Sequence, residues 1–292
     1  MDFRLTEDQK ALRRGVRDLL AGRFDREALR AAVDSGGTLD RDLWRELGAA
    51  GFFALRLPEE EGGVGLGLPE AVLVFEEAGR VLLPGPLVAT HLAAGAVPGA
   101  AEGAVVVTAV DEGLVPWLDE ADVVLGDAEG AVPIRSVDPL TPLHRVPVPA
   151  PTGDGGAAGL EAVLLTAAEQ VGSAEATTGA AVSHAREREQ FGQVIGGFQA
   201  VKHLCAGMLV RTELARAAVR AASLTADPVE IAGAKLLADE AATANARDCL
   251  QVHGGMGFTW EADVHLHLKR AWVRAELRLP AARAEEAVAA GL

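Results

Sequence analysis

Apolar side chains recur at helical spacing along most of this chain. Near its start, a periodic stretch follows Thr6, which can cap a helix through its side-chain oxygen. The apolar residues of this stretch are Leu12, Val16, Leu19 and Leu20. The same spacing predicts helices at about 40–50 and 69–81, and Pro84 and Pro86 end the second of these. On the helix at 69–81, Glu76, Glu77 and Arg80 indicate a face that is only half-buried.

The pattern changes between residues 105 and 148. Short runs of β-branched residues at 105–107, 123–125 and 146–148 are separated by acidic and glycine-rich turns, which predicts a few small antiparallel strands. So few strands make only a small sheet. Residues 149–159 hold two prolines and four glycines and are the clearest linker in the chain.

Three long helical stretches follow, at about 160–188, 198–224 and 228–252. They are rich in alanine and leucine, so we expect them to pack on one another or against a second subunit. The predicted fold is therefore mainly α. It has an N-terminal helical domain (1–100), a reduced β-domain (101–150) and a C-terminal helical bundle (151–292).

Charge and composition exclude several classes of partner. The net charge is −15, which disfavours nucleic acid and anionic membrane surfaces because both require clustered basic residues. The first residues are polar and acidic, and no apolar run reaches the roughly 20 residues that span a bilayer. Cys205 and Cys249 lie far apart within helical patterns, which is typical of reduced thiols. We therefore expect a cytoplasmic protein.

Two glycine-rich segments carry the candidate chemistry. At 251–258, three glycines follow a long helix, which is typical either of a helix cap or of a loop whose N–H groups bind an anion. At 186–199, Arg188 ends one helix, Phe191 follows it, and the next helix begins with its electropositive end. Arg188 can bind a pyrophosphate in bidentate fashion. An ordinary turn between helices with a surface arginine has the same pattern.

These segments resemble a known family. Residues 186–203 and 251–258 are similar to the two signature segments of the acyl-CoA dehydrogenases, which are flavoenzymes, while 1–9 and 57–65 resemble their N-terminal helical domain. Residues 79–86 and 257–270 are similar to the actinobacterial branch that includes sterol-degrading dehydrogenases. The resemblance implies an all-helical N-terminal domain, a middle β-domain and a C-terminal four-helix bundle, with FAD partly at a subunit interface.

The resemblance also implies which residues bind FAD. Arg188, Phe191 and Gln199 match residues that reach the flavin of a neighbouring subunit. The segment 251–255 matches the one that contacts the adenosine pyrophosphate. The implied cofactor-binding residues are thus Arg188, Phe191, Gln199, Gln251, Val252, His253, Gly254 and Gly255. By contrast, the middle domain is much shorter than in the family, and the loops that hold the isoalloxazine ring and the thioester have no match.

The catalytic base of the family also has no direct match. The two positions from which family members take a glutamate align with Arg278 and Ala162. Glu161 is one residue away, but one step along a helix rotates a side chain by about 100°. Glu261 lies in the glycine-rich turn, where it can equally cap the last helix or form an ion pair with it. Glu161 and Glu261 are the candidates for the base.

No metal site is predicted. Asp263, His265 and His267 are two residues apart on a helix, so their side chains diverge and cannot share a tetrahedral ligand set. His184 and His203 lie in long helices and are expected at surfaces or interfaces.

The predicted function is FAD-dependent dehydrogenation of an acyl-CoA. In this hypothesis the chain is the flavin-interface subunit, without the base, of an α2β2 heterotetramer with a full-length acyl-CoA dehydrogenase. The alternative is a noncatalytic scaffold or regulatory subunit of the same fold that has lost flavin. A third is a stand-alone homo-oligomeric enzyme with a divergent substrate. The branch resemblance favours CoA thioesters derived from sterols.

Overall fold

Side-chain caps begin the first helices of the computed structural model, which describes residues 4–147 and 157–291. Helix α1 (Glu7–Arg23) starts at Thr6, whose Oγ1 accepts the N–H of Gln9 at 3.1 Å while the Gln9 side chain accepts the N–H of Thr6 at 3.0 Å. Asp25 caps α2 (Arg26–Asp34) and Asp40 caps α3 (Arg41–Ala49), each through a side-chain oxygen that accepts a backbone N–H of the first turn. The periodicity predicted α1 and α3 but missed the short α2.

Four of the remaining helices, α4, α6, α7 and α8, agree with the predicted ranges within a few residues. The N-terminal region continues with α4 (Leu68–Arg80) and α5 (Leu87–Ala93), of which only α4 was predicted. The C-terminal region comprises α6 (Ala157–Glu187), α7 (Gln199–Thr225), α8 (Pro228–His253), α9 (Val264–Glu276) and α10 (Ala281–Ala290). The predicted linker at 149–159 and the strand residue Val148 lie outside the described residues, except for the start of α6.

The strands between the two helical regions form two small sheets. Strands β2 (Leu114–Pro116), β5 (Leu143–Arg145) and β4 (Val132–Ile134) pair antiparallel in that order. Strands β1 (Val107–Ala109) and β3 (Val123–Leu125) are parallel, with Val107 opposite Val123. The prediction of antiparallel strands was wrong for this pair, because β2 and a turn of 3-10 helix intervene and return the chain in the same direction.

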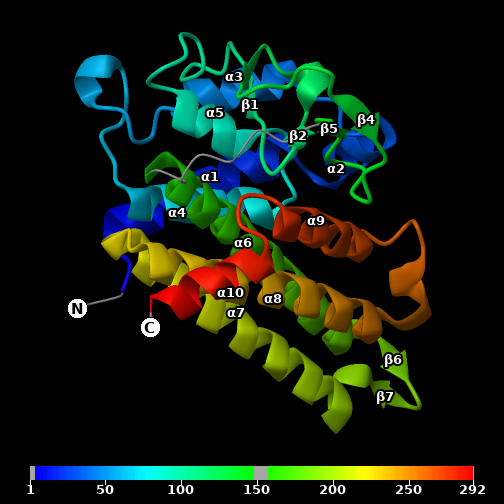
Figure 1. Cartoon of the computed structure of the whole chain (residues 1–292). Coiled ribbons are helices and arrows are strands. Elements are labelled where there is room, and N and C mark those ends of the chain that lie inside the picture. The colour runs from blue at the N-terminus through cyan, green and yellow to red at the C-terminus, as the bar shows by residue number, and fades with distance from the viewer. Residues whose placement is uncertain (1–3, 148–156, 292) are drawn as a thin grey trace.

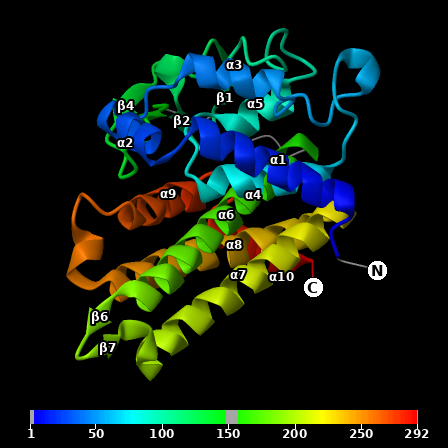
Figure 2. The ribbon, with the colours of Figure 1, turned by 180° about the vertical axis from the view of Figure 1, so that it is seen from behind.

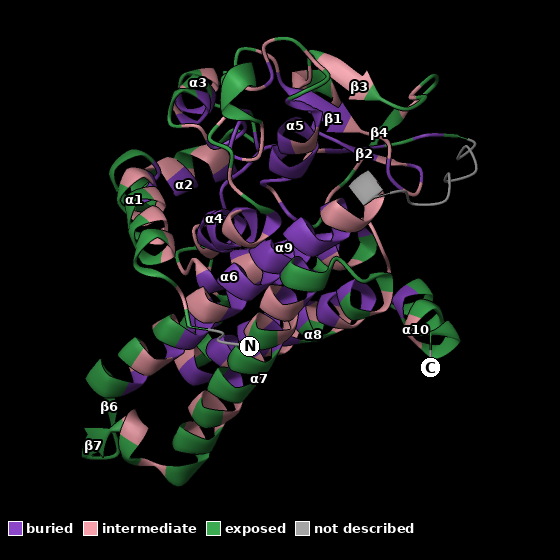
Figure 3. Cartoon of the chain, turned by 90° about the vertical axis from the view of Figure 1, so that its left-hand side faces the viewer, coloured by how far each residue is buried: buried purple, intermediate pink, exposed green. Residues whose placement is uncertain are grey.

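The molecule has two layers (Figure 1). Helices α1 to α5 and strands β1 to β5 form the upper layer, and α6 to α10 form the lower one. Seen from behind, α1 lies across α4, which in turn packs on α6 (Figure 2). The four-helix bundle is formed by α6, α7, α8 and α9, and α10 packs on α8. The buried side chains concentrate where α4, α6 and α9 meet, whereas α7 and α10 have wide exposed faces (Figure 3).

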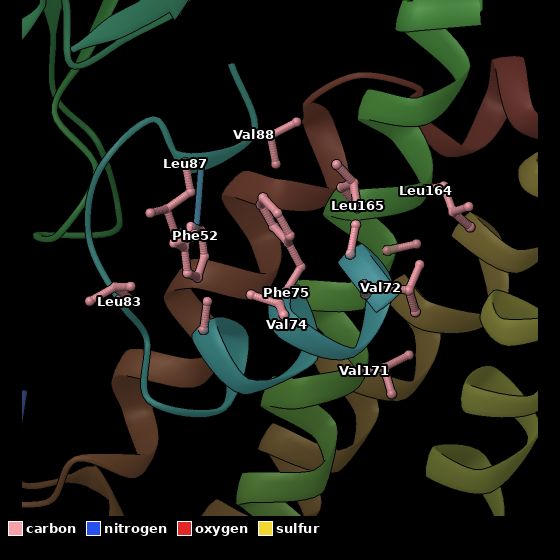
Figure 4. Packing of buried hydrophobic residues seen from close by; sticks show 14 of the residues in the cluster. Phe52, Val72, Val74, Phe75, Leu83, Leu87, Val88, Leu164, Leu165 and Val171 are labelled. Carbon is pink, nitrogen blue, oxygen red and sulfur yellow. The ribbon is translucent and has the colours of Figure 1, made fainter. Parts of the chain in front are cut away.

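The main core lies between α4 and α6. Val72 and Phe75 of α4 face Leu165 and Val171 of α6 (Figure 4). The two helices can approach closely because Gly172 has no side chain. A Cβ at this position would lie 1.8 Å from a backbone oxygen of α4. Close packing of this kind fixes the two layers against each other.

On the face of α4 that was predicted to be half-buried, Arg80 is partly exposed as expected, but the two glutamates are fully buried. Glu76 and Glu77 are 0% exposed, because α4 lies between α1, α6 and α7. Both carboxylates are paired with arginines of neighbouring helices, and Arg220 of α7 binds Glu76 with two hydrogen bonds of 3.0 and 2.8 Å. Sequence periodicity registers a charged residue as exposed, and only the arginines from distant segments make its burial possible.

Candidate flavin-interface site

A two-residue hairpin presents Phe191 to solvent. After α6 ends, β6 (Glu189–Gln190) pairs with β7 (Gln193–Val194), and Phe191 and Gly192 at the turn have φ of 55° and 81°. Positive φ at both central residues is the turn that best fits the twist of a hairpin. The Phe191 side chain is 91% exposed and contacts Phe198 edge-on, with ring centroids 6.1 Å apart. An aromatic ring this exposed is available to pack on a partner.

The glycine-rich segment ends α8 and opens to solvent. Gly254 adopts φ 61° and ψ −143°, a conformation that is essentially restricted to glycine. A Cβ on Gly254 or Gly255 would meet nothing within 4 Å, whereas one on Gly257 would lie 2.9 Å from the carbonyl oxygen of Leu250. Packing within the chain therefore requires Gly257 alone, and the backbone at Gly254 and Gly255 is accessible to a ligand.

A histidine pair joins the two segments. His184 of α6 stacks on His253 of α8, with ring centroids 4.1 Å apart. Four residues further along α6, the Arg188 N–H donates to the carbonyl oxygen of His184 at 2.9 Å. The stack therefore places Arg188, at the end of α6, close to the glycine-rich segment that begins at Gly254, which we call the Gly254 loop.

The exposed polar side chains at this end fit a phosphate-bearing cofactor. Arg188, Gln199 and Gln251 are exposed, and none of their side chains has a hydrogen-bond or ion-pair partner among residues 4–147 and 157–291. Val252, in contrast, is buried in a small core between α6, α7 and α8. A guanidinium is a donor that binds a pyrophosphate, and Gln199 and Gln251 add exposed side-chain amides. The N–H of Gly254, in contrast, already donates to the carbonyl oxygen of Gln251.

The two candidates for the base lie in different environments. Arg56 binds both carboxylate oxygens of Glu161, with distances of 2.7 and 2.8 Å. Glu261 is exposed, and its pKa is lowered by a hydrogen bond from its own backbone and by Thr259. The ion-pair role expected for Glu261 at the start of α9 belongs instead to Asp263, which pairs with Arg26 at 2.6 Å.

A buried carboxylate in α6 was not among the candidates predicted from the sequence. Glu169 is 6% exposed and lies seven residues after Ala162, on the same face of the helix because seven residues make nearly two turns. Burial raises its pKa, against the opposing effect of Arg274. Glu169 lines a cavity of ≈ 50 Å³ together with Arg278, the residue aligned with the family's base. The seven-residue spacing from Ala162 was the signal that could have identified it.

The acidic and histidine residues of α9 have separate partners. His265 stacks on Trp260 with ring centroids 5.0 Å apart, and Nδ1 of the buried His267 lies 2.8 Å from Oγ of Ser173. Among the described residues no group of three His, Cys, Asp or Glu side chains is placed to hold a metal ion. Cys205 and Cys249 are both free thiols. No helix within the described ranges is long and apolar enough to cross a bilayer.

Comparison with known proteins identifies the family. The N-terminal domain model of acyl-CoA dehydrogenases matches residues 6–103, and the C-terminal domain model matches residues 162–277. The acyl-CoA dehydrogenase IpdE2 of Mycobacterium tuberculosis is 38% identical over 302 residues, which cover 93% of each chain. That relative therefore shares the short length of this chain.

Solved structures show the same fold. A steroid acyl-CoA dehydrogenase, Tcur3481-Tcur3483, is 25% identical with a TM-score of 0.85, and the match covers 97% of each chain. The ChsE4-ChsE5 complex of Mycobacterium tuberculosis gives a TM-score of 0.86 at 23% identity, covering 99% of this chain and 98% of the other. The order of helices and strands, the two signature segments and these matches agree, and the chain belongs to the acyl-CoA dehydrogenase family.

Proposed function

We propose that this chain is the flavin-interface subunit of an α2β2 acyl-CoA dehydrogenase whose full-length partner holds the reactive end of FAD and supplies the base. FAD, when bound, accepts the substrate β-hydrogen as hydride after a carboxylate removes the α-proton. In this assignment Arg188 and the Gly254 loop bind the pyrophosphate, and Phe191, Gln199 and Gln251 position the cofactor across the interface.

The observation that carries the proposal is the contrast between the C-terminal end of α6, at Arg188, and the interior of the same helix, at Glu169. At the Arg188 end, donors are exposed and have no partner among the described residues. Beside Glu169, the cavity of ≈ 50 Å³ is far smaller than the roughly 300 Å³ or more of small-molecule sites. Nineteen residues of helix separate Glu169 from Arg188, or about 28 Å. The open end thus serves a site outside this chain's own cavity.

The surface of α7 supports a partner chain. Its outer face exposes Leu209, Val210 and Leu214, which are 53%, 57% and 58% exposed. Contiguous apolar residues on a long helix mark a surface that a protein partner covers. The relatives whose structures superpose include the ChsE4-ChsE5 complex and a steroid acyl-CoA dehydrogenase. We extend this to a heterotetramer acting on CoA thioesters of sterol-derived acids.

Co-expression with a full-length homologue encoded beside this chain tests the proposal. We expect the chain alone to be colourless and the complex to be yellow, with flavin absorbance that bleaches on addition of a sterol-derived acyl-CoA. Bleaching by the chain alone would contradict the proposal and favour a stand-alone enzyme. Absence of flavin from every combination would favour the noncatalytic scaffold. A scaffold does not require exposed cofactor-binding residues.

A further inference from the structure

Three arginines at four-residue spacing line the cavity beside Glu169. Arg270 and Arg274 lie on α9 and Arg278 follows its end, while Glu169 is contributed by α6. Trp117 closes the cavity from the strand region, with its ring 6.0 Å from the Arg270 guanidinium. The cavity thus lies where the bundle meets the strand region.

Arg274 has a buried donor without an acceptor. The residue is 5% exposed, and its Nη2 donates to Glu169 Oε1 at 2.6 Å. Its Nη1 has no hydrogen-bond partner among the described residues. Because a buried charged donor without an acceptor is unfavourable, the missing acceptor belongs inside the cavity.

The arginines of the lining supply N–H donors for an anion as that acceptor. The lining holds three guanidinium groups and one carboxyl group. Asp138 pairs with Arg270 from outside the lining, and Asp111 lies 3.8 Å from Arg278. Each arginine therefore has one carboxyl neighbour, and burial raises the pKa of the Glu169 carboxyl against the opposing effect of Arg274.

Two residues of the lining have strained backbones. Trp117 and Arg278 adopt φ of 53° and 70°, in the left-handed region that disfavours residues with a Cβ. The Arg278 N–H donates to Asp111 Oδ2 at 2.6 Å, which holds this conformation. Such strain concentrates at ligand sites, where the surrounding structure maintains it.

We propose that this cavity binds one small oxyanion of carboxylate or bicarbonate size, with Nη1 of Arg274 as its principal donor. The volume of ≈ 50 Å³ exceeds the roughly 10–15 Å³ that one water requires. The anion accepts the Nη1 donor of Arg274 and holds α9 against α6 and the strand region. The proposal does not depend on flavin or on a partner chain.

Formate-dependent thermal stability of the full chain tests this site. Formate replaces gluconate, which is too large for the cavity, at constant ionic strength and pH. We expect the melting temperature to rise by roughly 2–5 °C and to saturate with formate concentration. Equal melting temperatures in the two salts would show that water alone fills the cavity and would overturn the proposal.

Variants separate this site from a general salt effect. Arg274→Met should remove the dependence on formate, and Glu169→Gln should shift half-saturation to lower formate because it removes the competing charge. Arg41→Met is the matched control, since Arg41 pairs with Asp122 at 2.6 Å away from the cavity. It should keep the full response. If Arg274→Met does not fold, an unchanged half-saturation in Glu169→Gln overturns the proposal.

Discussion

His184 and His253 stack nearly face to face, with an interplanar angle of 19° and ring centroids 4.1 Å apart. Nδ1 of His253 lies 2.8 Å from the carbonyl oxygen of Cys249, so the proton of the neutral ring resides on Nδ1. Two neutral imidazoles stack favourably, whereas two protonated ones repel. The pair therefore joins α6 to α8 beside the site proposed for flavin.

The first prediction concerns the titration of His184. Burial lowers its pKa below 6.5, and the charges of His253 and Arg188 lower it further against the opposing effect of Glu187. In His253→Gln the pKa of His184 should rise toward 6.5, because the neutral glutamine removes the charge effect by which His253 lowers it. NMR titration of the imidazole resonances measures it. His203→Gln, on the exposed side of α7, is the control and should leave the titration of His184 unchanged.

Buried histidines predict a loss of stability in mild acid. Burial lowers the pKa of His91 to about 4 and that of His267 to about 3. Below pH 6.5 the unfolded chain takes up these protons and the folded chain does not. Stability is therefore complete above pH 6.5 and falls as pH decreases to about 4, by about 1.4 kcal/mol per pH unit for each histidine.

Urea unfolding between pH 7 and pH 4.5 measures this loss. His267→Gln keeps a hydrogen-bonding group beside Ser173 and should reduce the slope of stability against pH by one histidine's share. Equal slopes for the variant and the parent chain would show that His267 titrates normally when folded.

Substitution at the α4–α6 contact should be strongly destabilising. A Cβ on Gly172 would lie 1.8 Å from the backbone oxygen of Glu76, so Gly172→Ala forces the helices apart. We expect a loss of about 1–3 kcal/mol in the free energy of unfolding. Gly179→Ala, on the same helix with nothing within 4 Å, should instead stabilise by about 0.5–1 kcal/mol. Similar values for the two variants would contradict the close contact.

Glu77 should be essential for the docking of α1. Burial raises its pKa, but hydrogen bonds from Arg17 and Arg13 outweigh burial and bring it below 4.5. Glu77→Ala removes the buried carboxylate that Arg13, Arg17 and Arg80 share, while Arg13 and Arg17 keep Glu175, so we expect a loss of about 1–3 kcal/mol. Glu7→Ala, which removes only the exposed pair with Lys10, should leave the denaturation midpoint unchanged. A small effect of Glu77→Ala would mean that α1 is held by apolar contacts alone.

Removal of Arg188 should weaken flavin binding without affecting the fold. Loss of a charge-assisted contact worth roughly 1.5–3 kcal/mol corresponds to a ten- to hundredfold weaker affinity in the assembled complex. The flavin content of co-purified Arg188→Gln complex measures it, and the melting temperature of the chain should stay unchanged because Arg188 is exposed. Arg186→Gln, two residues earlier and also exposed, is the control. Full flavin content in both variants would remove Arg188 from the site.

Local signals were sufficient for much of this structure. Thr6 caps its helix as the sequence indicates, because a cap depends only on residues three or four apart. The long helices were evident from their periodicity, and the segments around Arg188 and Gly254 from their glycines. The short helices α2 and α5 were missed, because so few residues leave little periodicity to detect.

The sequence by itself therefore determined the long helices, their order and the family, whereas contacts between distant segments decided the rest. Burial of Glu77 requires arginines some sixty residues away, and the parallel pairing of β1 and β3 depends on the path of the intervening chain. The cavity beside Glu169 forms only when α6, α9 and the strand region meet. The burial of a charge and the shape of a cavity depend on contacts between side chains that are distant in the sequence. No local sequence pattern records those contacts.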